Sequence, residues 1–86
     1  MRIELLHLAG PCRGDCESFA GPVIRIGSGP DAEVSLPGAR GVAAAHARIV
    51  IEGSDAYLRS SAPVRVNRAV VEEVVLSEGD LVELGD

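Results

Sequence analysis

Residues 46–52 read HARIVIE, and they form the clearest strand pattern in a chain whose dominant hydrophobic period is two. Residues 22–27, PVIRIG, repeat the pattern, with Ile24 and Ile26 alternating with their neighbours. Successive side chains of a strand point to opposite faces, so this alternation places one apolar face against a core. Both stretches therefore predict β-strands.

Further short strand patterns surround these two, and turn signals rich in glycine, proline and aspartate separate them. The alanines of residues 40–47 favour a helical turn, but that segment is too short and too glycine-flanked for a stable helix. Short strands at near-regular spacing predict an all-β sandwich or barrel, and residues 1–86 form one domain without linker or repeat. The remaining expected strands are residues 1–8, 33–36, 56–60, 64–67, 70–76 and 80–85.

Composition excludes several classes of protein. At 86 residues and 47% hydrophobic content, the chain is one small domain with enough apolar residues for a core. The formal net charge of −5 argues against nucleic-acid binding, which normally requires a basic face. No apolar run reaches the length of about 20 residues that a membrane span needs, and the N-terminus lacks a signal-peptide pattern. We therefore expect a cytoplasmic domain without membrane insertion.

The residues that carry chemistry do not form a recognisable catalytic or metal site. Cys12 and Cys16 lie close together in CRGDC, which leaves open a local disulfide or two free thiols. With His7 and His46 as the only histidines, no zinc-ligand spacing is present, and we expect neither metal nor cofactor. His46 with one of the cysteines is the only conceivable thiol dyad, and no third orienting residue is suggested. A binding module is the simpler interpretation, and we expect no enzyme.

Four stretches, in this order, resemble a forkhead-associated (FHA) domain: RIGSGPDAEVSL (25–36), GVAAAHARI (41–49), RVNR (65–68) and LSEGDLVELG (76–85). The resemblance extends over about residues 2–86 and implies a β-sandwich of short antiparallel strands, whose loops at one end bind phosphothreonine peptides. Independently of the family, Gly27 ends a strand pattern, where glycine tolerates a positive φ without steric cost. The last strand of the family, which pairs beside the first, has no counterpart here.

The resemblance also locates the positions at which the family contacts its peptide, and most of them carry unexpected residues. Phosphate recognition needs an arginine, hydroxyls or amide donors aimed at its oxygens, and alanine offers none. His46 keeps the family's histidine, whose implied role is to brace a loop through hydrogen bonds. Ser28 replaces an arginine, Ala43 and Ala44 replace a serine and an arginine, Ala62-Pro63 replaces Asn-Gly, and Arg68 replaces the glycine after Asn67.

We therefore expect an FHA-type interaction or assembly module that has lost phosphothreonine recognition, as in divergent bacterial secretion-system components. The alternative is a phosphopeptide-binding domain that uses substituted residues such as Arg40 and Arg68, with Arg59 and Arg65 nearby. We expect a protein partner, and we expect the domain to be the N-terminal part of a longer chain. Without the last strand of the family, the edge near residues 2–8 is open, which predicts a homodimer through that strand.

Overall fold

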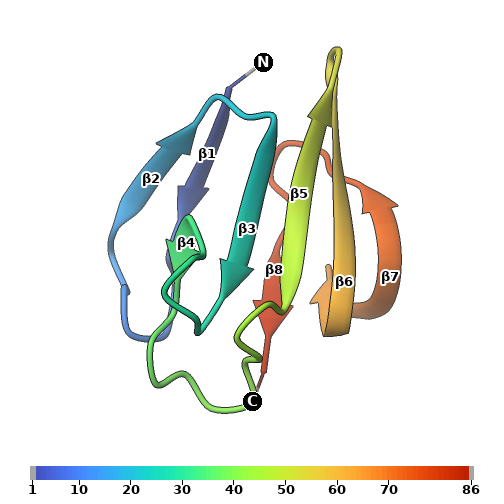
Figure 1. Ribbon diagram of the computed structural model, residues 1–86. Helices are drawn as coiled ribbons and strands as arrows, with labels where there is room; N and C mark the ends of the chain where they lie inside the picture. The colour runs from blue at the N-terminus through green and yellow to red at the C-terminus, as the bar shows by residue number, and fades with distance from the viewer. Residues whose placement is uncertain (1, 86) are drawn as a thin grey trace.

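The computed structural model describes residues 2–85, and these residues are built from strands and irregular segments (Figure 1). Met1 and Asp86, the two ends of the predicted domain, lie outside the described residues. The strands are β1 (Ile3–Leu6), β2 (Cys16–Phe19), β3 (Val23–Gly27), β4 (Val34–Ser35), β5 (Ala47–Glu52), β6 (Asp55–Val66), β7 (Ala69–Val75) and β8 (Val82–Leu84). The prediction of an all-β fold is confirmed.

The larger sheet has the strand order β4-β3-β5-β6-β7, and β8 pairs with β6 outside this path. All its pairings are antiparallel except that of β3 with β4. Figure 1 shows β3, β5 and β6 side by side. The apolar alternation in the sequence corresponds to alternating burial in the structure. Ile24, Ile49 and Leu58 are almost completely buried, and exposed residues such as Arg25, Arg48 and Arg59 are their neighbours along the strands.

Strand β6 is one continuous element of 12 residues, where the sequence predicted two strands with a gap. Its register with β7 shifts between Arg59 and Val64, so the strand changes direction without ending. The first part pairs with β5, and Val64–Val66 pairs with β8. Pro63 lies within the irregular part, where a residue without an N–H group costs no ladder bond.

Strands β1 and β2 form a separate antiparallel pair in which Ile3 lies opposite Phe19. Ile3, Leu5 and Phe19 pack against the buried core, so this pair covers apolar surface that the larger sheet leaves open. Strand β2 was not predicted, because CESF (16–19) carries too few apolar residues to show a strand pattern. Within residues 2–85, β1 pairs only with β2.

The alanine-rich segment before β5 contains turns and no helix, as its length predicted. In the part of the chain that the structure describes, no helix is long and apolar enough to cross a membrane. Cys12 and Cys16 are both free thiols.

Candidate functional site

The loops that follow β3 and β4 lie against each other at one end of the larger sheet. The backbone N–H of Ser28 donates to the carbonyl of Ala43 at 3.0 Å, and that of Gly29 donates to Ala44 at 3.2 Å. The hydroxyl of Ser28 donates to the carbonyl of Val42 at 2.9 Å. The Ser28 side chain therefore holds the second loop instead of extending into solvent.

Gly27 is required for this contact, but for a different reason from the one the sequence suggested. Its φ is not positive, so backbone freedom does not explain the glycine. A Cβ at this position would overlap the carbonyl oxygen of Ala44 and lie 2.8 Å from that of Ala43. Gly27 is therefore needed because the backbone of the second loop passes directly over it.

His46 is the one polar residue in the buried class among the described residues, with 1% of its surface exposed. Its Nδ1 accepts from the backbone N–H of Ala43 at 3.0 Å, and its Nε2 lies 2.8 Å from the carbonyl oxygen of Pro63. A neutral ring with its hydrogen on Nε2 satisfies both partners. Since both ring nitrogens are taken by backbone groups, neither is free for a thiol or a metal.

The bend of β6 meets the same histidine through the main chain. The backbone N–H groups of Ser61 and Ala62 both donate to the carbonyl of His46, at 2.8 and 3.2 Å. The structure therefore brings together five of the positions that the sequence marked, from two loops and the bent strand: Ser28, Ala43, Ala44, His46 and Ala62.

Asn67 and Arg68 lie elsewhere, at the two-residue turn between β6 and β7. Their φ values are 51° and 72°, which are typical of a type I′ hairpin turn. The Asn67 side chain accepts from the N–H of Leu81 at 3.0 Å and donates to Asp80 at 2.9 Å. Within residues 2–85, no hydrogen bond joins this turn to the loops around His46. The strand segment Val64–Val66 separates the two regions.

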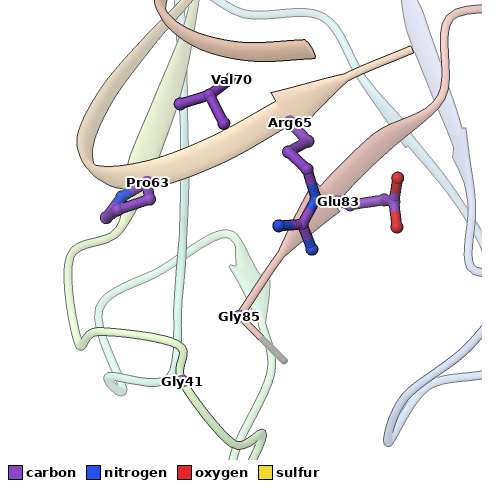
Figure 2. Close-up of a pocket in the computed structure, with 6 residues that line it drawn as sticks. All are labelled: Gly41, Pro63, Arg65, Val70, Glu83 and Gly85. Carbon is purple, nitrogen blue, oxygen red and sulfur yellow. The ribbon is translucent and has the colours of Figure 1, made fainter. Parts of the chain in front are cut away.

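A hollow of about 180 Å³ opens where β6 bends beside β8 (Figure 2). Figure 2 shows Pro63 at the bend, Arg65 and Glu83 on adjacent strands, and Gly41 on the loop below them. Arg65 lies opposite Glu83 in the β6–β8 register, so the hollow offers one positive and one negative group. Arg40 contacts this end through its carbonyl, which lies against Gly85. Sequence reasoning named Arg65 and missed Glu83, because no local pattern reveals which strands pair.

The β3–β4 loop is closed by an ion pair between Arg25 and Glu33. The guanidinium of Arg25 donates to both carboxylate oxygens of Glu33, at 3.0 and 2.6 Å, and its backbone N–H donates to the same carboxylate. These bonds lower the pKa of Glu33 to about 2, with the side-chain hydrogen bond contributing most, and raise the pKa of Arg25. The pair fixes the base of this loop, in addition to the backbone contacts and the hydroxyl of Ser28.

The described residues contain no cluster of side chains that could hold a metal ion. Three or more metal-binding side chains do not gather anywhere in residues 2–85. The thiol of Cys12 donates to the carbonyl of Ser35 at 3.6 Å, so it tethers the β1–β2 loop to β4. This end of the molecule presents a surface of loops on a β-sandwich, which is where functional residues are commonly found.

Comparison with known proteins identifies that domain. The family model of the FHA domain matches residues 24–85, and the chain belongs to this family. FHA domains are protein interaction modules, and the fold described above agrees with that class. No curated protein matches the chain.

Three solved structures show the likeness. The FHA domain of FhaA, crystallised with the intracellular domain of Rv3910, is 35% identical, with a TM-score of 0.76 over 84% of this chain and 81% of that one. A structure from work on phosphothreonine-dependent FHA domain interactions has the same identity and TM-score, and the match covers 84% of this chain and 77% of that chain. The FHA domain of CT664 from Chlamydia trachomatis is 24% identical, with a TM-score of 0.86 over 99% and 90% of the two chains, and it supports the fold alone.

Proposed function

We propose that this chain is an interaction or assembly module of the FHA type that has lost phosphothreonine recognition. The observation that carries the proposal is the chemistry of the loop end, which is formed by the loops that follow β3 and β4 and by the bend of β6. Ser28 stands where the family has an arginine, and its hydroxyl donates to Val42 within the protein. Ala43, Ala44 and Ala62 contribute no polar side chain to this surface. The proposal includes a protein partner and a cytoplasmic location, with this domain as one part of a longer protein.

The alternative is that other residues replace the lost contacts. Two of the solved relatives were crystallised or studied as binding domains, one in phosphothreonine-dependent interactions. Here Arg68 lies at the β6–β7 turn, with no hydrogen bond to the loops around His46 in the described residues. Arg65 faces Glu83, whose carboxylate repels a phosphate. Arg40 is the remaining candidate, and one arginine without converging donors is a weak phosphate site.

Titration with a matched pair of peptides tests the proposal. A phosphothreonine peptide library and its unphosphorylated copy are measured by calorimetry at two salt concentrations. We expect weak, salt-sensitive binding with no preference for phosphate. Each hydrogen bond to a charged group contributes about 1.5–3 kcal/mol, and the side chains expected to make such bonds with the phosphate are missing here. Micromolar affinity that depends on the phosphate would overturn the proposal and support the alternative.

A gain-of-function variant makes the test sharper. The triple substitution Ser28→Arg, Ala43→Ser and Ala44→Arg restores the family residues on a loop framework that the structure retains. We expect this variant to acquire phosphate-dependent binding. Arg40→Ala in the natural chain is the matched control for the alternative: it abolishes binding if Arg40 is the replacement and changes nothing under our proposal.

We also propose that the domain forms a homodimer through β1. In the described residues β1 pairs only with β2, and Leu6 and Leu8 are 61% and 62% exposed. An unpaired edge beside exposed leucines favours the addition of another strand. A twofold dimer satisfies this with one self-complementary interface.

Sedimentation at several protein concentrations tests the dimer. Leu6→Lys is the disrupting variant, because Leu6 is exposed, whereas Leu5 packs against the core and its substitution would disturb the fold. Val70→Lys is the matched control, because Val70 is equally exposed on another strand. We expect dimers that Leu6→Lys dissociates and Val70→Lys preserves, and a monomer at all concentrations would refute the dimer without affecting the loop-end proposal.

A further inference from the structure

The solvent side of the larger sheet carries a row of charges that crosses four strands. In the strand register, Arg25 lies opposite Arg48, Arg48 opposite Arg59, and Arg59 opposite Glu73. Directly opposed residues share a face, and all four are exposed. We call this set the arginine row.

An apolar row runs beside it. On each of the four strands its residue lies two positions away from the residue of the arginine row. Val23 lies opposite Val50, Val50 opposite Tyr57, and Tyr57 opposite Val75. Val23 and Val75 are 41% and 49% exposed, while Val50 and Tyr57 are half-buried. The two rows together define the outer face: Val23, Arg25, Arg48, Val50, Tyr57, Arg59, Glu73 and Val75.

Arg48 is the arginine of this row whose charge is not balanced within the described residues. Arg25 is paired with Glu33 at 2.6 Å and Arg59 with Glu73 at 3.4 Å, whereas no carboxylate within residues 2–85 forms an ion pair with Arg48. Like charges placed directly opposite each other in a sheet are destabilising. Arg48 stands between two such neighbours, in a protein whose net charge is −5.

A hollow of about 410 Å³ lies at this position, lined by Arg48, Arg59, Ser60, Ser61, Glu72 and Glu73. Arg48 and the exposed Ser61 can donate to an incoming carboxylate, and Arg59 can do so beside its pairing with Glu73; the carboxylates of Glu72 and Glu73 restrict that carboxylate to the Arg48 side of the hollow. On the other side of the apolar row, Glu52 and Asp55 form an opposed acidic pair at the end of β5 and β6. Along the strands the outer face therefore passes from an acidic pair through an apolar row to the arginine row, in which Arg48 is the arginine without an ion-pair partner in residues 2–85.

We propose that the outer face binds a segment of another protein in which apolar side chains are followed by aspartates or glutamates. The apolar side chains would cover the apolar row, and the carboxylates would reach Arg48 and Arg59. The charge order of the face fixes the orientation of the segment, because the reverse orientation would place its carboxylates over Glu52 and Asp55. This surface lies on the sheet and not on the loop end, so it does not depend on the loss of phosphothreonine recognition.

Nuclear magnetic resonance titration with synthetic peptides tests this surface. The probe is an acetylated peptide in which a run of valines is followed by glutamates, and the control peptide has lysine in place of glutamate. We expect salt-sensitive shifts of backbone signals at Arg48, Tyr57, Arg59 and Val75 with the first peptide and none with the second. The amides of the loop end around Ala43 should not move.

Two charge reversals locate the binding. Arg48→Glu removes no ion pair described here, so the variant should fold, and we expect it to weaken binding about tenfold or more. Arg13→Glu changes the charge equally at an exposed turn far along the chain and should leave the affinity unchanged. Absence of shifts, equal binding of the lysine peptide, or equal losses in the two variants would overturn the proposal.

Discussion

His46 and Asn67 perform similar tasks in two regions of the molecule, and the regions differ chiefly in solvent exposure. Each side chain joins two segments by bonding to backbone groups: His46 joins Ala43 to Pro63, and Asn67 bonds to Leu81 and to Asp80. His46 is buried, whereas Asn67 is exposed at a tight turn. Water can replace the bonds of Asn67, but it cannot reach those of His46.

Because of this difference in exposure, the loss of each side chain should have a different effect on the free energy of unfolding. A buried donor or acceptor that loses its partner costs its full desolvation, whereas an exposed one returns to water. The contacts of the buried His46 ring should therefore contribute more to stability than those of the exposed Asn67, while the β6–β7 turn depends on its backbone conformation. Five of the positions that the sequence marked lie in the His46 region, where backbone hydrogen bonds hold the loops together without polar side chains at Ala43, Ala44 and Ala62.

The largest effect on stability is expected from Gly27→Ala, which disturbs the backbone contact between the two loops of the His46 region. The added Cβ would overlap the carbonyl of Ala44, and a main-chain atom cannot move aside like a flexible side chain. We expect a loss of about 3 kcal/mol or more in the free energy of unfolding, measured by urea denaturation. Gly29→Ala is the control: its Cβ would lie 3.0 Å from the same carbonyl oxygen, and its loss should be clearly smaller.

The next effect compares the two bracing residues directly. His46→Ala leaves the N–H of Ala43 and the carbonyl of Pro63 without partners in a buried site, and we expect it to cost about 1–3 kcal/mol. Asn67→Gly removes bonds that water can replace and avoids the strain that alanine would bring at a φ of 51°, so it should cost about 1 kcal/mol or less. Thermal and urea denaturation of both variants gives the ranking. Equal losses would show that burial does not distinguish the two regions.

Arg68→Gly tests the exposed region, in which stability depends on the backbone conformation of the β6–β7 turn. Arg68 has a φ of 72°, in the left-handed region where a side chain costs about 1–2 kcal/mol and glycine does not. Part of this gain is offset by the chain entropy of glycine, so we expect a stabilisation of about 0.5–1 kcal/mol. A melting temperature that is unchanged or lower would contradict the strain. Asn67→Gly, which relieves φ but removes two bonds, should not stabilise.

The smallest effect concerns acid. Glu33, near the His46 region, has a pKa lowered to about 2, chiefly by Arg25. Asp80, beside Asn67, has a pKa lowered first by the N–H of Ser77 and then by Asn67. Lowered carboxylate pKa values add stability above the ordinary values of the groups, and this stability is lost as the pH falls through the folded values. Glu33→Gln and Asp80→Asn should each flatten the decline of stability in acid, with little change in slope above neutral pH.

A pH series of urea denaturation curves measures this effect. Glu33→Gln should change the curve more than Asp80→Asn, because its pKa shift is the larger and the bidentate bonds to Arg25 are lost. An unchanged acid limb in Glu33→Gln would contradict the role of the ion pair.

The sequence by itself determined the class of the fold, the family and most of the strands. Alternation of buried and exposed residues is a local property, since a strand turns successive side chains to opposite faces. That is why β3 and β5 could be predicted from HARIVIE and PVIRIG. It is also why β2 was missed, because CESF has too little apolar content to display the period.

Only the tertiary structure decided which segments meet. The passage of the Ala44 carbonyl over Gly27, the pairing of Arg25 with Glu33 and the row of three opposed arginines all depend on strand register and loop packing. These contacts join residues far apart in the chain, and they form only when closing the sandwich offsets the entropy of bringing them together. A linear pattern carries no record of that closure. The sequence therefore marked Ser28 and His46, and the structure showed that both side chains bond to the protein's own backbone.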